Sequence, residues 1–90
     1  MSKHTRQEQM EAFGRVLDVM DTLRARCPWD SKQTNQSLKS NTIEEVYELY
    51  DALSREDSPE IGKELGDVLM HVVFYSIFAR EKGAFDIVDV

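Results

Sequence analysis

The sequence predicts an all-α fold, an antiparallel helical bundle that we expect to be completed by oligomerisation. Apolar side chains recur every three to four residues, whereas no segment alternates apolar and polar side chains as a half-buried strand does. Apolar residues make up 41% of the 90 residues and charged residues 31%, as is typical of chains that fold. We therefore expect one domain, residues 1–90, whose core is marginal for a chain this short.

The first helix is predicted over residues 5–26. Pro28, in the stretch C-P-W-D, cannot continue the backbone hydrogen bonding and so ends this helix. Residues 31–40 are polar and are expected to form a short helical turn at most. The apolar stripe that predicts the helix consists of Met10, Phe13, Val16, Leu17, Met20 and Leu23.

A second helix is predicted over residues 41–54, and a tight connection over residues 55–57. Asn41 or Thr42 can cap this helix, because each is followed three residues later by a glutamate, which is the capping-box pattern. The shortness of the connection predicts that the next helix runs antiparallel beside this one.

The third helix is predicted over residues 59–82. Ser58 is expected to be its N-cap, with Pro59 at the first helical position, where a proline is favoured. Gly83 is a natural residue to end it. The closing stretch F-D-I-V-D-V is compatible with the beginning of a fourth helix.

Charge and cysteine content exclude several classes of protein. The net charge of −6 disfavours a nucleic-acid partner, because phosphate binding needs clustered Lys and Arg. Cys27 is the only cysteine, so neither an internal disulfide nor a Cys-rich zinc site is available. The longest apolar run, 12 residues from Val68, is too short to span a membrane, and the N-terminus has no apolar leader. We expect a cytoplasmic protein.

Two pairs of acidic residues predict a metal site. Glu45 and Glu48 on the second helix, and Glu64 and Asp67 on the third, are each spaced i, i+3 and so share a helical face. Glu48 and Glu64 are equally far from the midpoint of the connection, and so are Glu45 and Asp67. In an antiparallel pair, each residue then lies level with its counterpart, and the four carboxylates converge between the helices.

Such a convergence is unfavourable without a cation. Two like charges about 4 Å apart repel by roughly 4 kcal/mol at an effective dielectric constant of 20. A hard divalent cation bound by carboxylate oxygens removes this conflict. Mg²⁺ suits best, since it keeps some waters and takes substrate phosphates as its remaining ligands, and Mn²⁺ is the expected substitute.

A solvated helix face is the alternative interpretation of the acids on the second helix, where first-turn glutamates are favoured by the helix dipole. The third helix argues against it, because Asp67 and His71 are the only acidic or basic side chains of the Asp, Glu, Lys, Arg and His types in the apolar segment 65–79. Buried charge needs a partner or a metal. The observation behind the solvated-face alternative is the helical wheel of the second helix. On it the acids Glu44, Glu45, Glu48 and Asp51 lie opposite the apolar side chains Ile43, Val46, Tyr50 and Leu53.

The sequence resembles the MazG family of nucleoside triphosphate pyrophosphohydrolases. The motifs that carry the resemblance are C-P-W-D-S-K-Q-T (27–34), T-I-E-E-V-Y-E-L (42–49), K-E-L-G-D-V-L-M-H-V-V-F-Y (63–75) and the closing G-A-F-D-I-V-D-V. Each acidic motif alone is a weak signal, but the combination is specific, and it covers nearly the whole chain from Met10 onward.

The resemblance implies an all-α, Mg²⁺-dependent enzyme that cleaves a nucleoside triphosphate to the monophosphate and pyrophosphate, in the service of nucleotide-pool house-cleaning. By position, Glu45, Glu48, Glu64 and Asp67 resemble the family's metal ligands. Glu44, the first acid of the motif, is expected either to support a metal ligand or to act as the base that orients the attacking water. No protein nucleophile is needed, so Cys27 is interpreted as a packing residue.

Further site residues are expected around the acids. Trp29 either stacks on a nucleobase or plugs the end of the bundle. Lys32, Lys39 and Lys63 are candidates to bind phosphate, although solvated lysines are common. The residues expected to support the ligands without binding metal are Asp51 and His71.

The resemblance also implies that the C-terminal part of the domain is missing. MazG domains usually continue past the F-D-I-V-D-V position into a helix with basic residues and an R-H-P-H-V-F-like segment. Those basic residues would be expected to hold the substrate's phosphates. This chain is therefore expected either to bind metal and nucleotide weakly or to be inactive.

The sequence also suggests two rival functions and an expected oligomeric state. The first rival is a non-catalytic oligomerisation or regulatory module that retains the carboxylate site; the second, a di-iron bundle, is disfavoured because E-x-x-H pairs are absent. A homodimer or a higher even oligomer is expected, because an apolar face of the third helix needs cover. This face consists of Val72, Val73, Phe74, Ile77 and Phe78.

Overall fold

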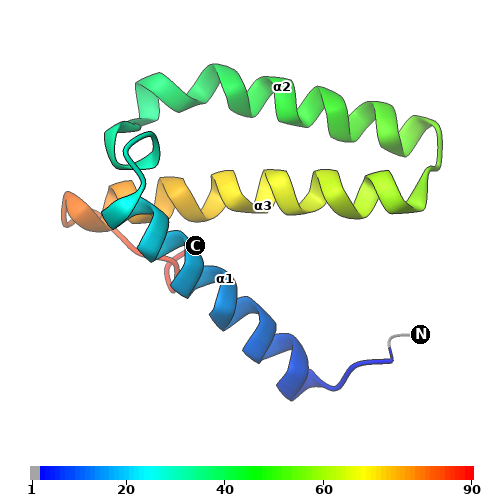
Figure 1. Ribbon diagram of the computed structural model, residues 1–90, viewed down its shortest axis with the longest axis horizontal. Helices are drawn as coiled ribbons and strands as arrows, with labels where there is room; N and C mark the ends of the chain where they lie inside the picture. The colour runs from blue at the N-terminus through cyan, green and yellow to red at the C-terminus, as the bar shows by residue number, and fades with distance from the viewer. Residues whose placement is uncertain (1–2) are drawn as a thin grey trace. The chain divides into compact units, whose positions relative to one another are not determined.

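The computed structural model describes residues 3–90, and its secondary structure is helical (Figure 1). Within these residues it contains α1 (Arg6–Arg26), the short 3-10 helix η1 (Asp30–Lys32), α2 (Asn35–Ser54) and α3 (Ser58–Glu81), and no strand. The all-α prediction is confirmed. The chain divides into two compact units, residues 1–31 and 32–90.

Helix α1 begins and ends where the sequence predicts. Its N-cap Thr5 accepts a hydrogen bond at Oγ1 from the backbone N–H of Glu8 (3.1 Å), while the Glu8 carboxylate accepts one from the Thr5 N–H (2.8 Å). This reciprocal pair satisfies two N–H groups that a helix start leaves unpaired. The last turn closes with the N–H of Cys27 on the Leu23 carbonyl (2.9 Å), directly before Pro28.

Helix α2 begins at Asn35, six residues before the predicted start, so the prediction of a cap at Asn41 or Thr42 is wrong. The cap is Thr34, whose Oγ1 accepts from the Ser37 N–H (3.1 Å), and Ser37 Oγ accepts from the Thr34 N–H (2.8 Å). Serine takes the place of the glutamate in this capping box. Buried Leu38 anchors the additional turns.

Helix α3 is capped by Asp57 rather than by the predicted Ser58. The Asp57 carboxylate accepts from the N–H of Glu60 (3.3 Å), so Ser58 and Pro59 fall inside the first turn. The helix ends at Glu81, and Gly83 follows with φ +70°, a conformation that favours glycine. The predicted end of the helix is confirmed to within one residue.

The stretch after Gly83 forms a turn and no fourth helix. Asp86 organises it: its Oδ1 accepts from the N–H of Val88 (2.9 Å), and its own N–H donates to the Asp89 carboxylate (3.0 Å). Aspartate side chains commonly stabilise turns in this way, in competition with helix formation.

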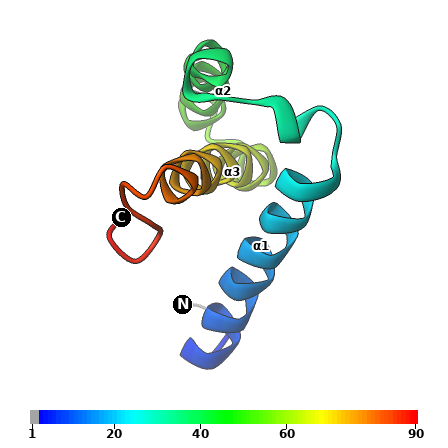
Figure 2. The same cartoon turned by 90° about the vertical axis from the view of Figure 1, so that its left-hand side faces the viewer.

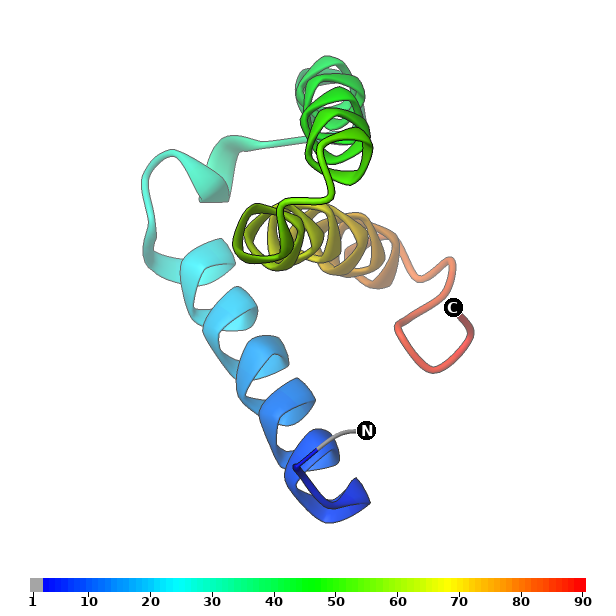
Figure 3. The same cartoon turned by 90° about the vertical axis from the view of Figure 1, so that its right-hand side faces the viewer.

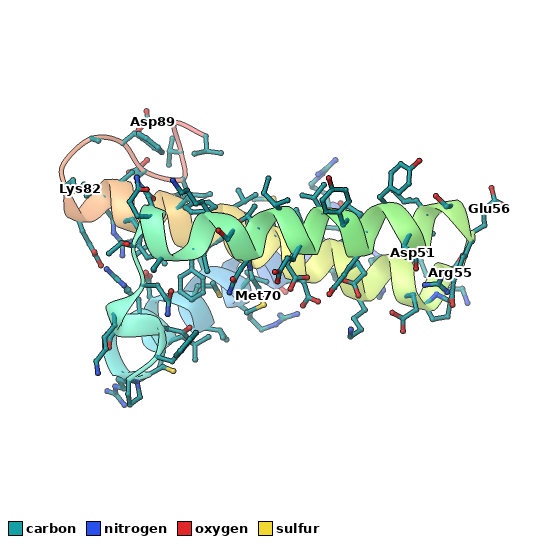
Figure 4. The ribbon with its side chains drawn as sticks, turned by 90° about the horizontal axis from the view of Figure 1, so that it is seen from above. Asp51, Arg55, Glu56, Met70, Lys82 and Asp89 are labelled. Atoms are coloured by element: carbon teal, nitrogen blue, oxygen red, sulfur yellow. The ribbon has the colours of Figure 1, made fainter. Side chains whose placement is uncertain are left out.

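Helices α2 and α3 pack side by side as an antiparallel hairpin, which is visible from the side and from both ends (Figures 1, 2 and 3). The connection is tight: Glu56 has φ +50°, and the Arg55 guanidinium binds the carboxylates of both Asp51 (3.0 Å) and Asp57 (3.2 Å). Figure 4 shows Asp51 and Arg55 together at this end of the hairpin. The predicted antiparallel arrangement is confirmed.

The positions on α2 that are shielded from solvent recur every three to four residues. They form one stripe along the helix, as expected for the side that packs against α3. Acidic Glu45 lies in the middle of this stripe. The stripe consists of Leu38, Thr42, Glu45, Leu49 and Ala52.

The apolar side chains that the structure leaves exposed are not the ones that the sequence suggested. Of the α3 face predicted to need cover, only Val72 is exposed, and the other four side chains are buried. Instead, α2 exposes a stripe of apolar side chains at i, i+3, i+4, i+7 and i+10. This stripe, called the α2 apolar face below, consists of Ile43, Val46, Tyr47, Tyr50 and Leu53.

No helix within residues 3–90 combines the length and the apolar character that crossing a bilayer requires.

Candidate metal centre

Three carboxylates converge between α2 and α3. Glu45 and Glu48 from α2 and Glu64 from α3 each offer an oxygen, and these three oxygens lie within 4.8 Å of one another. The two α2 residues are one turn apart on the same face, and the antiparallel hairpin brings Glu64 level with them. An all-oxygen ligand set with this spacing suits a hard divalent cation.

The position of the acids in α2 excludes the helix-dipole interpretation. Because α2 begins at Asn35, Glu45 lies in the third turn, and the first turn contains no acid. The favourable field at a helix N-terminus fades within the first turn. The dipole therefore does not explain why acids occur here.

Burial also separates these acids from a solvated helix face. Glu64 is only 4% exposed, and one of its oxygens, Oε1, lies 3.4 Å from the Lys63 ammonium. Its other oxygen, Oε2, and the Oε2 of Glu45 are buried and have no hydrogen-bond partner in the part of the chain that the structure describes. Buried polar atoms without partners are rare and costly, and an ion is one of their recognised explanations. The carboxylates present therefore fit a cation.

The electrostatics of Glu45 point the same way. Burial raises the pKa of the Glu45 carboxyl above its ordinary value, and the negative charges of Glu48, Asp67 and Glu64 raise this pKa further. Without a cation, the cluster thus resists being fully ionised. A divalent cation would supply the missing positive charge and favour the ionised form of all three ligands.

The other acids predicted for the site lie outside this group of mutually close oxygens. Asp67 is half-buried on α3, near enough for its charge to act on Glu45. Glu44 is exposed. Asp51 is exposed and forms an ion pair with Arg55 at the connection, 3.0 Å away.

One functional candidate was missed by sequence reasoning. Thr42, expected to be a helix cap, lies instead within α2, one turn before Glu45. Its Oγ1 forms hydrogen bonds with His71 Nδ1 (2.6 Å) and with the hydroxyl of Tyr75, both on α3. Burial lowers the pKa of His71 below its ordinary value, and the charge of Asp67 opposes this shift. His71 is therefore part of a polar contact beside the acids.

Comparison with known proteins identifies the family of this chain. Residues 33–90 match the model of the MazG nucleotide pyrophosphohydrolase domain. The chain belongs to this family. All four acids predicted as ligands fall inside the matched region of this MazG domain.

Relatives with curated names agree. The nucleoside triphosphate pyrophosphohydrolase/pyrophosphatase MazG of Thermotoga maritima is 48% identical over 80 residues, which cover 87% of this chain and 31% of the relative. The nucleoside triphosphate pyrophosphohydrolase of Escherichia coli K12 is 44% identical over 84 residues, 90% of this chain and 32% of the relative. That of Mycobacterium tuberculosis is 40% identical over 77 residues, 83% of this chain and 24% of the relative. This MazG chain spans about a third or less of these relatives.

The predicted phosphate-binding and base-stacking residues of this MazG chain belong to different segments. Lys63 lies beside the cluster, and its contact with Glu64 raises the pKa of its ammonium group. Lys39 is exposed on α2 and Lys32 on η1. Trp29 is 68% exposed in the segment before η1. Of the three lysines, Lys63 is the one that the structure places next to the acids.

Proposed function

We propose that this MazG domain binds Mg²⁺ between α2 and α3 and hydrolyses nucleoside triphosphates to the monophosphate and pyrophosphate. The observation that carries the proposal is the pair of buried, unpartnered carboxylate oxygens on Glu45 and Glu64, within a cluster of three glutamates. Family membership and the printed names of the relatives support the reaction. We assign Glu45, Glu48 and Glu64 as ligands, and Asp67 as a fourth ligand that closes in when the cation binds.

The chemistry divides between the cation and the side chains. When bound, Mg²⁺ neutralises phosphate charge and lowers the pKa of a coordinated water. In the reaction a water oxygen forms a bond to the α-phosphorus, the bond from that phosphorus to the oxygen bridging to the β-phosphorus breaks, and the water's proton is taken up by a carboxylate. We assign that proton acceptor as Glu44, which is exposed and adjacent to the ligand Glu45. Lys63 offers a positive charge beside the cluster.

The remaining side chains are assigned by position. Lys32 and Lys39 are proposed to contact the phosphates, and Trp29 to stack on the base, because all three side chains are exposed to solvent. Removal of unwanted triphosphates from the nucleotide pool is the proposed purpose, and Mn²⁺ the proposed substitute for Mg²⁺.

The products test the proposal directly. We expect the chain, incubated with each canonical or modified triphosphate and Mg²⁺, to release pyrophosphate, so that orthophosphate appears only after inorganic pyrophosphatase is added. The E48Q variant, which removes one ligand charge, is the matched negative control. Orthophosphate release without the added pyrophosphatase would mean cleavage of the γ-phosphate and would contradict the reaction assigned here.

A non-catalytic module that retains the carboxylate site is the second candidate function. It would bind Mg²⁺ at the same acids without turnover. Metal binding by calorimetry together with no pyrophosphate from any triphosphate is the result that would favour it over the enzyme.

We further propose that the domain is a homodimer or a higher even oligomer that buries the α2 apolar face. A stripe of apolar side chains at helical spacing is typical of a helix that packs against another helix. We expect V46E to weaken self-association by about tenfold or more, since burial of the Val46 side chain at the interface would contribute roughly 1.5–3 kcal/mol to the free energy of association. Analytical ultracentrifugation measures this, with V19E, a charge placed at an exposed valine of α1, as the matched control. An unmodified chain that is monomeric at micromolar concentration would overturn the proposal.

A further inference from the structure

The polar contact between α2 and α3 that does not belong to the acid cluster is centred on Thr42. Its hydroxyl oxygen contacts three groups: the carbonyl of Leu38 in its own helix (3.3 Å), His71 Nδ1 (2.6 Å) and the Tyr75 hydroxyl. The last two belong to α3, 29 and 33 residues further along the chain. A single oxygen therefore ties the two helices together at one height.

The hydrogen-bonding capacity of this hydroxyl is fully used. A threonine hydroxyl has one proton to donate and two lone pairs that accept. The Leu38 carbonyl can only accept, so a Thr42 hydroxyl that donates to it would accept from the Tyr75 O–H and from an N–H at Nδ1 of His71. His71 and Tyr75 also contact each other edge to face, with ring centroids 6.4 Å apart.

The rest of the stripe on α2 offers no comparable directional restraint. Leu38, Leu49 and Ala52 are apolar, and apolar packing is non-directional and tolerates small sliding of one helix along the other. Glu45 belongs to the same stripe, but its charge is repelled by Glu64 across the seam. A hydrogen bond, in contrast, weakens steeply with distance and angle.

A metal site needs that restraint. Ligand atoms must lie within about 0.2 Å of their ideal distances, whereas one residue of helix corresponds to about 1.5 Å of rise. A slide of α2 along α3 by a fraction of one residue would thus move Glu45 and Glu48 out of reach of a cation held by Glu64. Thr42 lies one turn from Glu45, in the same rigid helix.

We infer that Thr42 is a positioning residue, whose hydroxyl, held by His71 and Tyr75, sets the register of α2 on α3 in which the three glutamates share one cation. The inference rests on the metal centre proposed above. It assigns to His71 a role in supporting Thr42, and it adds Thr42 and Tyr75 to the groups on which metal affinity depends.

The test compares Mg²⁺ and Mn²⁺ affinity, measured by calorimetry on folded protein, among variants of this chain. T42V replaces the hydroxyl with a methyl group of the same shape, and we expect it to weaken metal binding about tenfold, as the loss of groups that support ligands does. T42S keeps the hydroxyl and should bind metal within about twofold of the unmodified chain. T22V is the matched control, because the Thr22 hydroxyl donates to the Asp18 carbonyl within α1 (3.0 Å).

Y75F gives a second, milder variant, since it keeps the ring and removes one of the two hydrogen bonds to α3. We expect about threefold weaker metal binding for Y75F, which keeps the test decisive if T42V does not fold. Equal affinity of T42V or Y75F and the unmodified chain would overturn the inference and leave the metal centre standing. An equal loss in T42S or T22V would also overturn it. An unmodified chain that binds neither cation would overturn both this inference and the proposed function.

Discussion

Replacing Glu64 by glutamine is expected to abolish Mg²⁺ binding and to lower kcat/KM by about a thousandfold. Glu64 is the one member of the cluster supplied by α3, and it is only 4% exposed. A ligand from solvent therefore cannot replace its carboxylate. Glutamine keeps the size of the side chain and a carbonyl oxygen that can still accept from Lys63. The variant should therefore fold, and what it loses is the negative charge on which a cation depends. Calorimetry with Mg²⁺ and steady-state pyrophosphate release measure the two effects.

A glutamate one turn earlier in α3 provides the control. Glu60 lies in the first turn of the helix, outside the group of close oxygens. We expect E60Q to leave Mg²⁺ affinity within about twofold and to cost about 0.5 kcal/mol of stability, because it removes a favourable charge at a helix N-terminus. If E64Q binds Mg²⁺ as tightly as the unmodified chain does, the site is not where we place it.

The helices and the acid cluster could be predicted because both depend on local periodicity. An i, i+3 spacing puts two carboxylates on one face of any helix, and a three-residue connection leaves little choice but an antiparallel hairpin. Given those two facts, Glu45 and Glu48 share one face of α2 and lie close to the height of Glu64 on α3. The start of α2 was missed because Thr34 and Ser37 are polar and look like loop residues, although they cap each other reciprocally.

What could not be predicted depends on partners distant in sequence. Helix α2 has an apolar side and an acidic side, and periodicity alone does not say which of them meets α3. The structure places Glu45 in the seam and leaves Val46 and Tyr50 exposed, the reverse of what hydrophobicity suggests. Thr42 was mistaken for a cap for the same reason, since its role depends on His71 and Tyr75 rather than on its own neighbours.

The placement of Glu45 in the seam leads to the second large expected effect: E45Q should stabilise the metal-free protein while abolishing its response to Mg²⁺. The Glu45 carboxyl has a raised pKa in the folded state, so near neutral pH the folded state bears the cost of ionising a half-buried group beside Glu48, Asp67 and Glu64. Glutamine removes the charge and keeps the shape. We expect the free energy of unfolding in EDTA at pH 8 to rise by about 1–2 kcal/mol, the size of an unsatisfied buried polar group. Urea denaturation followed by circular dichroism measures it.

The dependence on pH fixes the sign of this effect. Because the folded-state pKa of Glu45 is raised above its ordinary value of 4.5, the folded protein holds a proton that the unfolded chain has already lost as the pH rises past that value. The stability of the unmodified, metal-free protein should therefore fall with rising pH across that window and level off above it. The advantage of E45Q should shrink toward zero below pH 4.5.

Excess Mg²⁺ should reverse the order of stability of E45Q and the unmodified chain at pH 8, since binding to the folded state stabilises only the chain that keeps all its ligands. E44Q, at the exposed neighbour, should change stability by less than about 0.5 kcal/mol and keep the Mg²⁺ response. An E45Q variant that is less stable than the unmodified chain in EDTA at pH 8 would show that the carboxylates are accommodated without a cation, and the case for a metal centre at this seam would fail.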